Sequence, residues 1–189
     1  MAGMITGFPK PPTQVTQALH HLQILSASGL DRIDELGVDL DRLPRPWAPG
    51  TCDPWLRRQV WDWCDAVAAW INRDCLWRPT GTIPACWPQH PHLAHDLPLL
   101  ACQRWLADNA AHPGPLDDWH RIILPAFLDR MWQRLEQSSC LTGTHQDWPG
   151  RTRYQTYRNA KAVAARQRLF HADTNTPAQP TPPNPTPAL

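Results

Sequence analysis

One tryptophan-rich segment constrains the fold of this chain more than any other. Asp53 is a residue type that caps helix N-termini and Pro54 suits the first helical position, so a helix is predicted to begin there and to run to about residue 77. Residues 78–81, RPTG, favour its end. At about 100° per residue, the tryptophans of one face fall within an arc of about 80°. They are Trp55, Trp63, Trp70 and Trp77.

This tryptophan stripe is typical of a helix that packs in a core, because helical aromatic stripes usually face inward. The alternative is a stripe that forms a surface for a ligand or a partner. Trp61 lies off the stripe and is the better candidate for an outer contact.

Helical spacing recurs along the body of the chain, whereas the alternation typical of strands does not. Further helices are expected at 13–27, 30–43, about 92–111 and 115 to about 137. Pro125 lies inside the last of these and should kink it near Arg121, because proline removes a backbone donor. The sequence therefore predicts an all-α fold, a small bundle of about five helices.

The chain of 189 residues has room for one domain with tails. We expect a flexible N-terminus (1–12), a helical domain (13–148), a basic helical extension (149–171) and a disordered proline-rich tail (172–189). The tail ends TPAQPTPPNPTPAL, which lacks the apolar content needed to fold. The net charge differs between these parts of the chain. Residues 51–150 carry eight basic and eleven acidic side chains, a net charge of −3, whereas residues 151–189 carry six basic and one acidic side chain, a net charge of +5.

The apolar segments are too short to cross a bilayer, and no early stretch is built like a signal peptide. We therefore expect a cytoplasmic protein that has no membrane partner. In a reducing compartment its six cysteines are expected to be core thiols or metal ligands rather than disulfides. The sequence has no glycine-rich phosphate-binding pattern, so no nucleotide cofactor is expected.

The stretch CWPQHPHLAHD (86–96) gathers a cysteine, three histidines and an aspartate. Pro91 divides this stretch, because the residue before a proline, here His90, is kept out of helical conformation. His92 and His95 are three positions apart at the start of the next predicted helix and lie on the same face of it. One hypothesis makes the three histidines a catalytic zinc site with an open position for water, as in a metal-dependent hydrolase. No motif places the general base that such an enzyme needs.

A second hypothesis pairs this stretch with CLTGTH (140–145). Cys86 and His90 are four positions apart, and Cys140 and His145 are five apart, so that each pair can chelate one ion. Together they make the Cys2His2 donor set of a structural zinc site, which would fasten the loop before one helix to the end of the next. The sequence leaves open the alternative that Cys86 is a core thiol and that both histidines are solvated.

Asp117 and Asp118 stand close to His120 in DDWHR. Acidic residues at the start of a helix suit its dipole, and the grouping lacks a nucleophile. We therefore expect no catalytic residues here. A protein that is not an enzyme is favoured over the alternative, a metal-dependent hydrolase that uses His90, His92 and His95.

The extension carries basic and aromatic residues on one face of its predicted helix. Arginine and lysine can neutralise phosphates and tyrosines can stack on bases, so this face is a candidate for contacts with nucleic acid. The candidate residues are Arg151, Tyr154, Arg158, Lys161 and Arg168, with Tyr157 beside them. A solvated or membrane-surface helix is the alternative, which the acidic body and the lack of a helix-turn-helix signature favour.

The motifs VWDWCDAVAAWINR, IPACWPQHPHLAHDL, DDWHR and CLTGTH resemble those of small, tryptophan-rich, uncharacterised proteins of actinobacterial plasmids, integrative conjugative elements and phage-like elements. The resemblance covers about residues 55–148. It implies an all-helical cytoplasmic domain from a mobile element, without a known activity. The matching positions are Trp63, Cys64, Cys86, Trp87, His90, Trp119, His120, Cys140 and His145. Our leading hypothesis is a non-enzymatic helical module that binds DNA or a protein partner through its basic helix.

Overall fold

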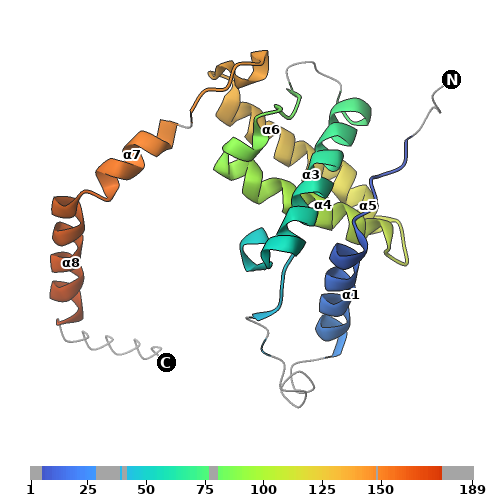
Figure 1. Ribbon diagram of the computed structural model, residues 1–189, viewed down its shortest axis with the longest axis horizontal. Coiled ribbons are helices and arrows are strands. Elements are labelled where there is room, and N and C mark those ends of the chain that lie inside the picture. Colours follow the sequence, from blue (N-terminus) through green and yellow to red (C-terminus); the bar gives the residue numbers. More distant parts are fainter. Residues whose placement is uncertain (1–5, 29–38, 40–41, 77–80, 148, 176–189) are drawn as a thin grey trace, which may run out of the picture. The chain divides into compact units, whose positions relative to one another are not determined.

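The computed structural model describes residues 6–28, 39, 42–76, 81–147 and 149–175 (Figure 1). Every regular element in these ranges is helical, which confirms the predicted all-α fold. The α-helices are α1 (Thr13–Ser28), α3 (Pro54–Asp74), α4 (Pro91–Asp108), α5 (Gly114–Asp118), α6 (Leu124–Leu135), α7 (Pro149–Tyr157) and α8 (Ala160–Thr174). The chain forms two compact units, Met1–Gln146 and Asp147–Leu189. Most of the helix expected at 30–43 and the end of the proline-rich tail lie outside the described residues.

Helix α3 lies at the centre of the first unit and packs against both α1 and α4 (Figure 1). It begins as predicted, because the Asp53 carboxylate accepts hydrogen bonds from the backbone N–H groups of Trp55 (2.9 Å) and Leu56 (3.0 Å). Its inner face includes Val60 and Ile71, both fully buried. No described helix is long and apolar enough to cross a membrane.

The tryptophan stripe of α3 is only partly buried. Trp63 and Trp70 lie in the core, and their indole N–H groups donate to the backbone oxygens of Pro9 (2.9 Å) and Thr6 (3.1 Å). These bonds hold the segment before α1 against α3, where a flexible segment was expected. The prediction that Trp55 is a core residue is wrong, since 61% of it is exposed, whereas the adjacent Leu56 in the same first turn of α3 is buried. Trp77 lies outside the described residues.

A buried arginine sits among the aromatic side chains of this core. The Arg104 guanidinium lies 5.0 Å from the ring centre of Phe8, 5.8 Å from that of Trp70 and 5.4 Å from that of Trp119. It also pairs with Asp108, one turn further along α4. Arg104 is only 7% exposed, and the rings and the carboxylate together compensate the cost of burying its charge.

The helix expected at 115–137 is interrupted where a kink was predicted. A π-helical turn, η5 (Trp119–Ile123), separates α5 from α6, and its Leu124 N–H bonds to the Trp119 carbonyl, five residues back. Pro125 has no N–H to bond the Arg121 carbonyl, and the wider turn accommodates this loss. The turn buries Trp119 completely, and the indole N–H donates to the Leu100 carbonyl (3.2 Å).

Candidate metal centre

Cys86 and His90 lie at the two ends of a 3-10 turn, η4 (Trp87–Gln89), which leads into α4. As the proline rule predicts, His90 has an extended backbone (φ −103°, ψ 106°) just before Pro91. The His90 N–H donates to the Trp87 carbonyl (3.1 Å), which closes the turn. The two side chains therefore face each other, with 3.4 Å between Cys86 Sγ and His90 Nε2.

Trp87 fixes this turn to the core. Its side chain is 3% exposed, and its Nε1–H donates to the Asp65 carboxylate on α3 (3.3 Å). Its ring also packs against that of Trp61, with 5.9 Å between ring centres. Trp61, expected to make an outer contact, is half-buried. The sequence did not indicate this role of Trp87, because neither Asp65 nor Trp61 is near it in the chain.

Cys140 and His145 lie on the segment that follows α6. The turn η6 (Ser139–Thr142) ends at Gly143, whose φ of 101° is a left-handed conformation that glycine adopts without strain. The chain then folds back, so that the Gln146 N–H donates to Cys140 Sγ (3.2 Å) and His145 Nδ1 lies 3.9 Å from the same sulfur. This second pair thus also has its two donor atoms close together.

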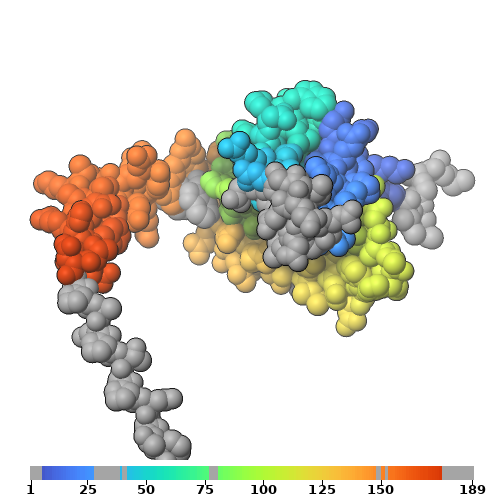
Figure 2. All heavy atoms as spheres, turned by 90° about the horizontal axis from the view of Figure 1, so that it is seen from below, coloured from blue at the N-terminus to red at the C-terminus, as the bar shows by residue number. Residues whose placement is uncertain are grey.

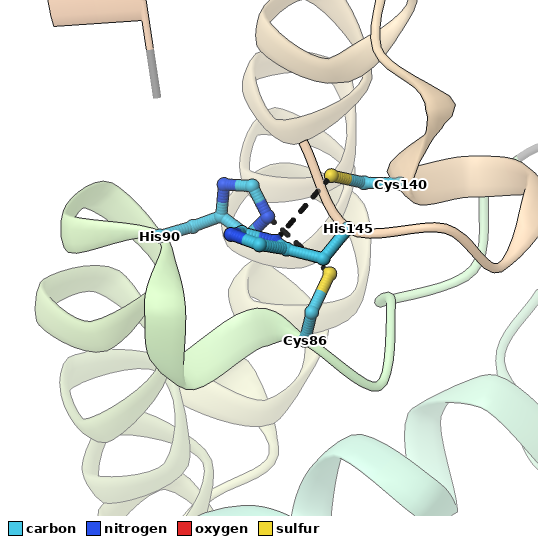
Figure 3. Close-up of side chains that lie close together, drawn as sticks. All are labelled: Cys86, His90, Cys140 and His145. Atoms are coloured by element: carbon cyan, nitrogen blue, oxygen red, sulfur yellow. Dashed lines mark hydrogen bonds between the residues drawn. The ribbon is translucent and has the colours of Figure 1, made fainter. Parts of the chain in front are cut away.

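The two pairs meet (Figure 3). One ligand atom from each of Cys86, His90, Cys140 and His145 lies within 4.8 Å of all the others, so that the group could hold a metal ion. The ring centres of His90 and His145 are 5.1 Å apart, and the angle between the ring planes is 69°. His90 and Cys140 are buried and the other two are half-buried. The structure thus brings together the two pairs that the sequence spacing singled out.

The distances suit a small tetrahedral site. Metal–ligand bonds of about 2.0 Å to nitrogen and 2.3 Å to sulfur put neighbouring ligand atoms about 3.3–3.8 Å apart. The two sulfur–nitrogen distances, 3.4 Å and 3.9 Å, lie close to this range. The widest separations, up to 4.8 Å, would have to contract by about 1 Å.

The pKa values of the group affect metal binding in two opposite ways. Burial lowers the pKa of His90, as does the nearby His145, so its imidazole is held in the neutral form that binds metals. Burial raises the pKa of the Cys86 thiol, and the neighbouring Cys140 raises it further. A bound divalent cation would reverse this penalty by stabilising the thiolates. The buried Nδ1 of His90 has no hydrogen-bond partner among the residues that the structure describes.

The other histidines of the 86–96 stretch do not join this group. His92 is half-buried and packs edge-on against His90, with 5.8 Å between ring centres. Burial, with a smaller effect of Arg134, lowers the pKa of His92 to about 4. His95 is exposed. Within the described ranges His90, His92 and His95 are not a cluster of possible ligands, so the geometry does not support the three-histidine hydrolase site.

His120 lines a separate cavity of about 750 Å³, between the end of α3 and α6. Cys75, Asp129 and Trp132 also line it. Burial raises the pKa of the Cys75 thiol to about 11, so at neutral pH this thiol is not an activated nucleophile. Burial, followed by the charge of Arg104, lowers the pKa of His120. The cavity therefore does not hold an activated thiol nucleophile.

The basic extension consists of two helices, although one was expected. The Asn159 side chain accepts a hydrogen bond from the Lys161 N–H (2.8 Å) and so caps α8 just after α7 has ended. The face predicted for a single helix is therefore divided between α7 and α8. The candidate residues Arg151, Tyr154, Arg158, Lys161 and Arg168 are all exposed.

Some cations of the extension stack on its tyrosines. The Arg158 guanidinium lies 5.8 Å from the ring centre of Tyr154. Arg166 lies 3.9 Å from the ring centre of Tyr157 and donates to the Tyr157 carbonyl (3.0 Å), which links α8 to the end of α7. The side chains of both helices form the surface of their unit in the space-filling view (Figure 2).

Comparisons with family models, with curated proteins and with solved structures find no match to this chain.

Proposed function

We propose that this chain is a non-enzymatic helical interaction module, that a structural zinc ion fastens its fold, and that its basic C-terminal helices bind DNA. One observation carries the proposal of a metal centre. Two cysteines and two histidines, from segments before α4 and after α6, place their ligand atoms within 4.8 Å of one another. The ligands are Cys86, His90, Cys140 and His145.

The donor set favours zinc. Thiolate sulfur and imidazole nitrogen are typical zinc ligands, whereas magnesium and calcium take oxygen ligands. Two thiolates cancel the charge of Zn²⁺, which suits a group in which His90 and Cys140 are buried. Because protein side chains fill all four positions, no position is left for a reactive water. These arguments support a structural rather than a catalytic ion.

The ion would join two segments that contain little regular structure. The segment 81–90 before α4 contains only the short turn η4, and the segment 136–146 after α6 contains only η6. The free energy of metal binding, about 10 kcal/mol or more in small zinc domains, acts as folding free energy when a site forms only in the folded state. Zinc would thus stabilise the packing of α4 against α6.

The charge of the extension supports a DNA partner. Residues 147–175 carry six basic and two acidic side chains, and five of the six basic side chains are exposed. Exposed tyrosines, Tyr154 and Tyr157, lie among them. Arginine and lysine so placed can neutralise phosphates, and binding of this kind depends strongly on salt.

Metal analysis of the purified full-length chain tests the metal centre. We expect about one equivalent of zinc per chain, because one ion fills the site. A content below about half an equivalent, in protein purified without chelators, would count against a structural site.

A further inference from the structure

Two of the four proposed ligands are thiols, and each comes from a different segment of the chain. Their Sγ atoms lie within 4.8 Å of each other, and both point toward the middle of the group (Figure 3). Cys86 comes from the segment before α4 and Cys140 from the segment after α6. A bond between them would join the same two segments that the metal joins.

We propose that Cys86 and Cys140 are a peroxide-sensitive pair, whose oxidation to a disulfide releases the metal ion. The release of metal rests on the proposed zinc centre, whereas the closeness of the two thiols does not. Oxidation would thus replace one link between the two segments by another.

The chemistry balances with hydrogen peroxide as the oxidant. One thiolate attacks a peroxide oxygen, so that an S–O bond forms, the O–O bond breaks and hydroxide leaves. The second thiolate attacks the resulting sulfenic sulfur, the S–S bond forms, and the S–O bond breaks to release a second hydroxide. Two protons from solvent convert the hydroxides to water, and the two electrons come from the thiolates. The centre then retains two imidazoles, too few to hold the ion.

The geometry allows the bond to form. The two sulfurs must approach from within 4.8 Å to about 2 Å, which requires a local shift of the backbone or of the side chains. Neither cysteine lies within an α-helix. Cys86 precedes η4, and Cys140 belongs to η6, a turn that ends at the left-handed Gly143. Short turns of this kind adjust more easily than the interior of a helix.

The environments of the remaining cysteines favour this pair as the site of oxidation. Cys52, Cys64 and Cys102 are 3%, 0% and 1% exposed. Burial raises the pKa of Cys52, that of Cys64 far above its usual value and that of Cys102 to about 12. Cys75 is half-buried, with its pKa raised to about 11. The thiolate is the reactive form, so these thiols should react slowly. Metal-bound Cys86 and Cys140 would already be thiolates.

Peroxide treatment of the full-length, zinc-loaded protein tests the proposal. Zinc release is followed with a chromogenic chelator, and alkylated peptides are identified by mass spectrometry. We expect a chain lighter by two hydrogens, a linked Cys86–Cys140 peptide, release of the bound zinc in step with the linkage, and recovery after dithiothreitol and fresh zinc. Cys75→Ser should behave like the wild type.

Three results would overturn the proposal: sulfinic acid at Cys86 without linkage, linkage of Cys86 to another cysteine, or linkage without loss of bound zinc. Metal-free protein is oxidised in parallel to separate this proposal from that of the zinc centre. If the purified chain lacks zinc but still links Cys86 to Cys140, the proposed zinc function fails and the thiol pair stands. If zinc is bound and no Cys86–Cys140 linkage forms, the thiol pair fails and the zinc centre stands.

Discussion

The indole N–H of Trp87 donates a hydrogen bond to the Asp65 carboxylate at 3.3 Å, and this bond ties the turn between Cys86 and His90 to helix α3. The core thereby positions one half of the candidate metal centre before any ion binds. The other half, Cys140 and His145, depends on the fold-back after Gly143.

Replacing Trp87 should therefore affect both stability and metal affinity. For Trp87→Ala we expect a loss of about 3–5 kcal/mol in the free energy of unfolding, because a large buried side chain is removed. Zinc affinity should fall as well, because the turn loses its attachment. Trp87→Phe should cost only about 1 kcal/mol from the lost hydrogen bond, apart from the change in ring size. Urea unfolding and competition with a zinc chelator measure the two effects.

Trp55 offers a matched control, because it is 61% exposed on the same helix that carries Asp65. Trp55→Ala should change stability by less than about 1 kcal/mol and leave zinc affinity unaltered. Equal effects of Trp55→Ala and Trp87→Ala would contradict the role assigned to Trp87.

Removing one sulfur ligand should abolish tight zinc binding. Cys140→Ser is expected to purify with little zinc and to lose several kcal/mol in the free energy of unfolding, because metal binding no longer contributes to folding. Cys75→Ser changes a half-buried thiol outside the centre and should retain the metal. Thermal unfolding with and without EDTA gives the readout. EDTA should lower the Tm of the wild type and of Cys75→Ser, and leave that of Cys140→Ser unchanged; a wild-type Tm that EDTA does not move would argue against the site.

His92 should make the protein less stable in mild acid. Its pKa is lowered to about 4 in the folded state, mainly by burial, against an ordinary value of 6.5. Between these values the unfolded chain binds a proton that the folded chain does not, so the free energy of unfolding falls as the pH falls from about 6.5 toward 4. Acid also protonates the metal ligands, an effect that a His92→Gln variant shares. Urea unfolding at several pH values should therefore show that the free energy of unfolding falls less with decreasing pH in His92→Gln than in the wild type. The same pH dependence in both proteins would disprove the contribution of His92.

The basic helices should bind duplex DNA in a salt-dependent manner. In the double variant Arg158→Ala/Lys161→Ala we expect weaker binding. The slope of log affinity against log salt concentration should also become shallower by about 0.9 for each lost phosphate contact. Arg58→Ala is a suitable control, because Arg58 is an exposed arginine on α3 that pairs with Asp62 (2.9 Å). Fluorescence anisotropy of labelled DNA provides the measurement. No binding by the wild type, or binding insensitive to salt, would rule out this partner.

Local rules predicted several parts of the molecule from the sequence. Asp53 and Pro54 start α3 because capping depends on neighbouring residues alone. Likewise, the extended conformation of His90 follows directly from Pro91. Spacing within each Cys/His pair indicated chelation, and the combination of the two pairs followed from the preference of zinc for sulfur and nitrogen donors.

Other features depend on contacts that no local pattern encodes. Periodicity gives the face of a helix on which a residue lies, but not whether another part of the chain covers that position, so Trp55 was assigned to the core although it is exposed. The break at Asn159 arises because its side chain competes for a backbone N–H that a continuous helix would use. The cage around Arg104 could not be predicted, because its rings come from three separate segments.

X-ray absorption at the zinc edge of the purified full-length protein tests the central claim most directly. The account predicts a four-coordinate ion with two sulfur ligands at about 2.3 Å and two nitrogen ligands at about 2.0 Å. The sulfur ligands would be Cys86 and Cys140, and Cys140→Ser should remove the signal of a two-sulfur site. A first shell made only of nitrogen and oxygen atoms, or protein that contains no zinc, would contradict the proposed centre.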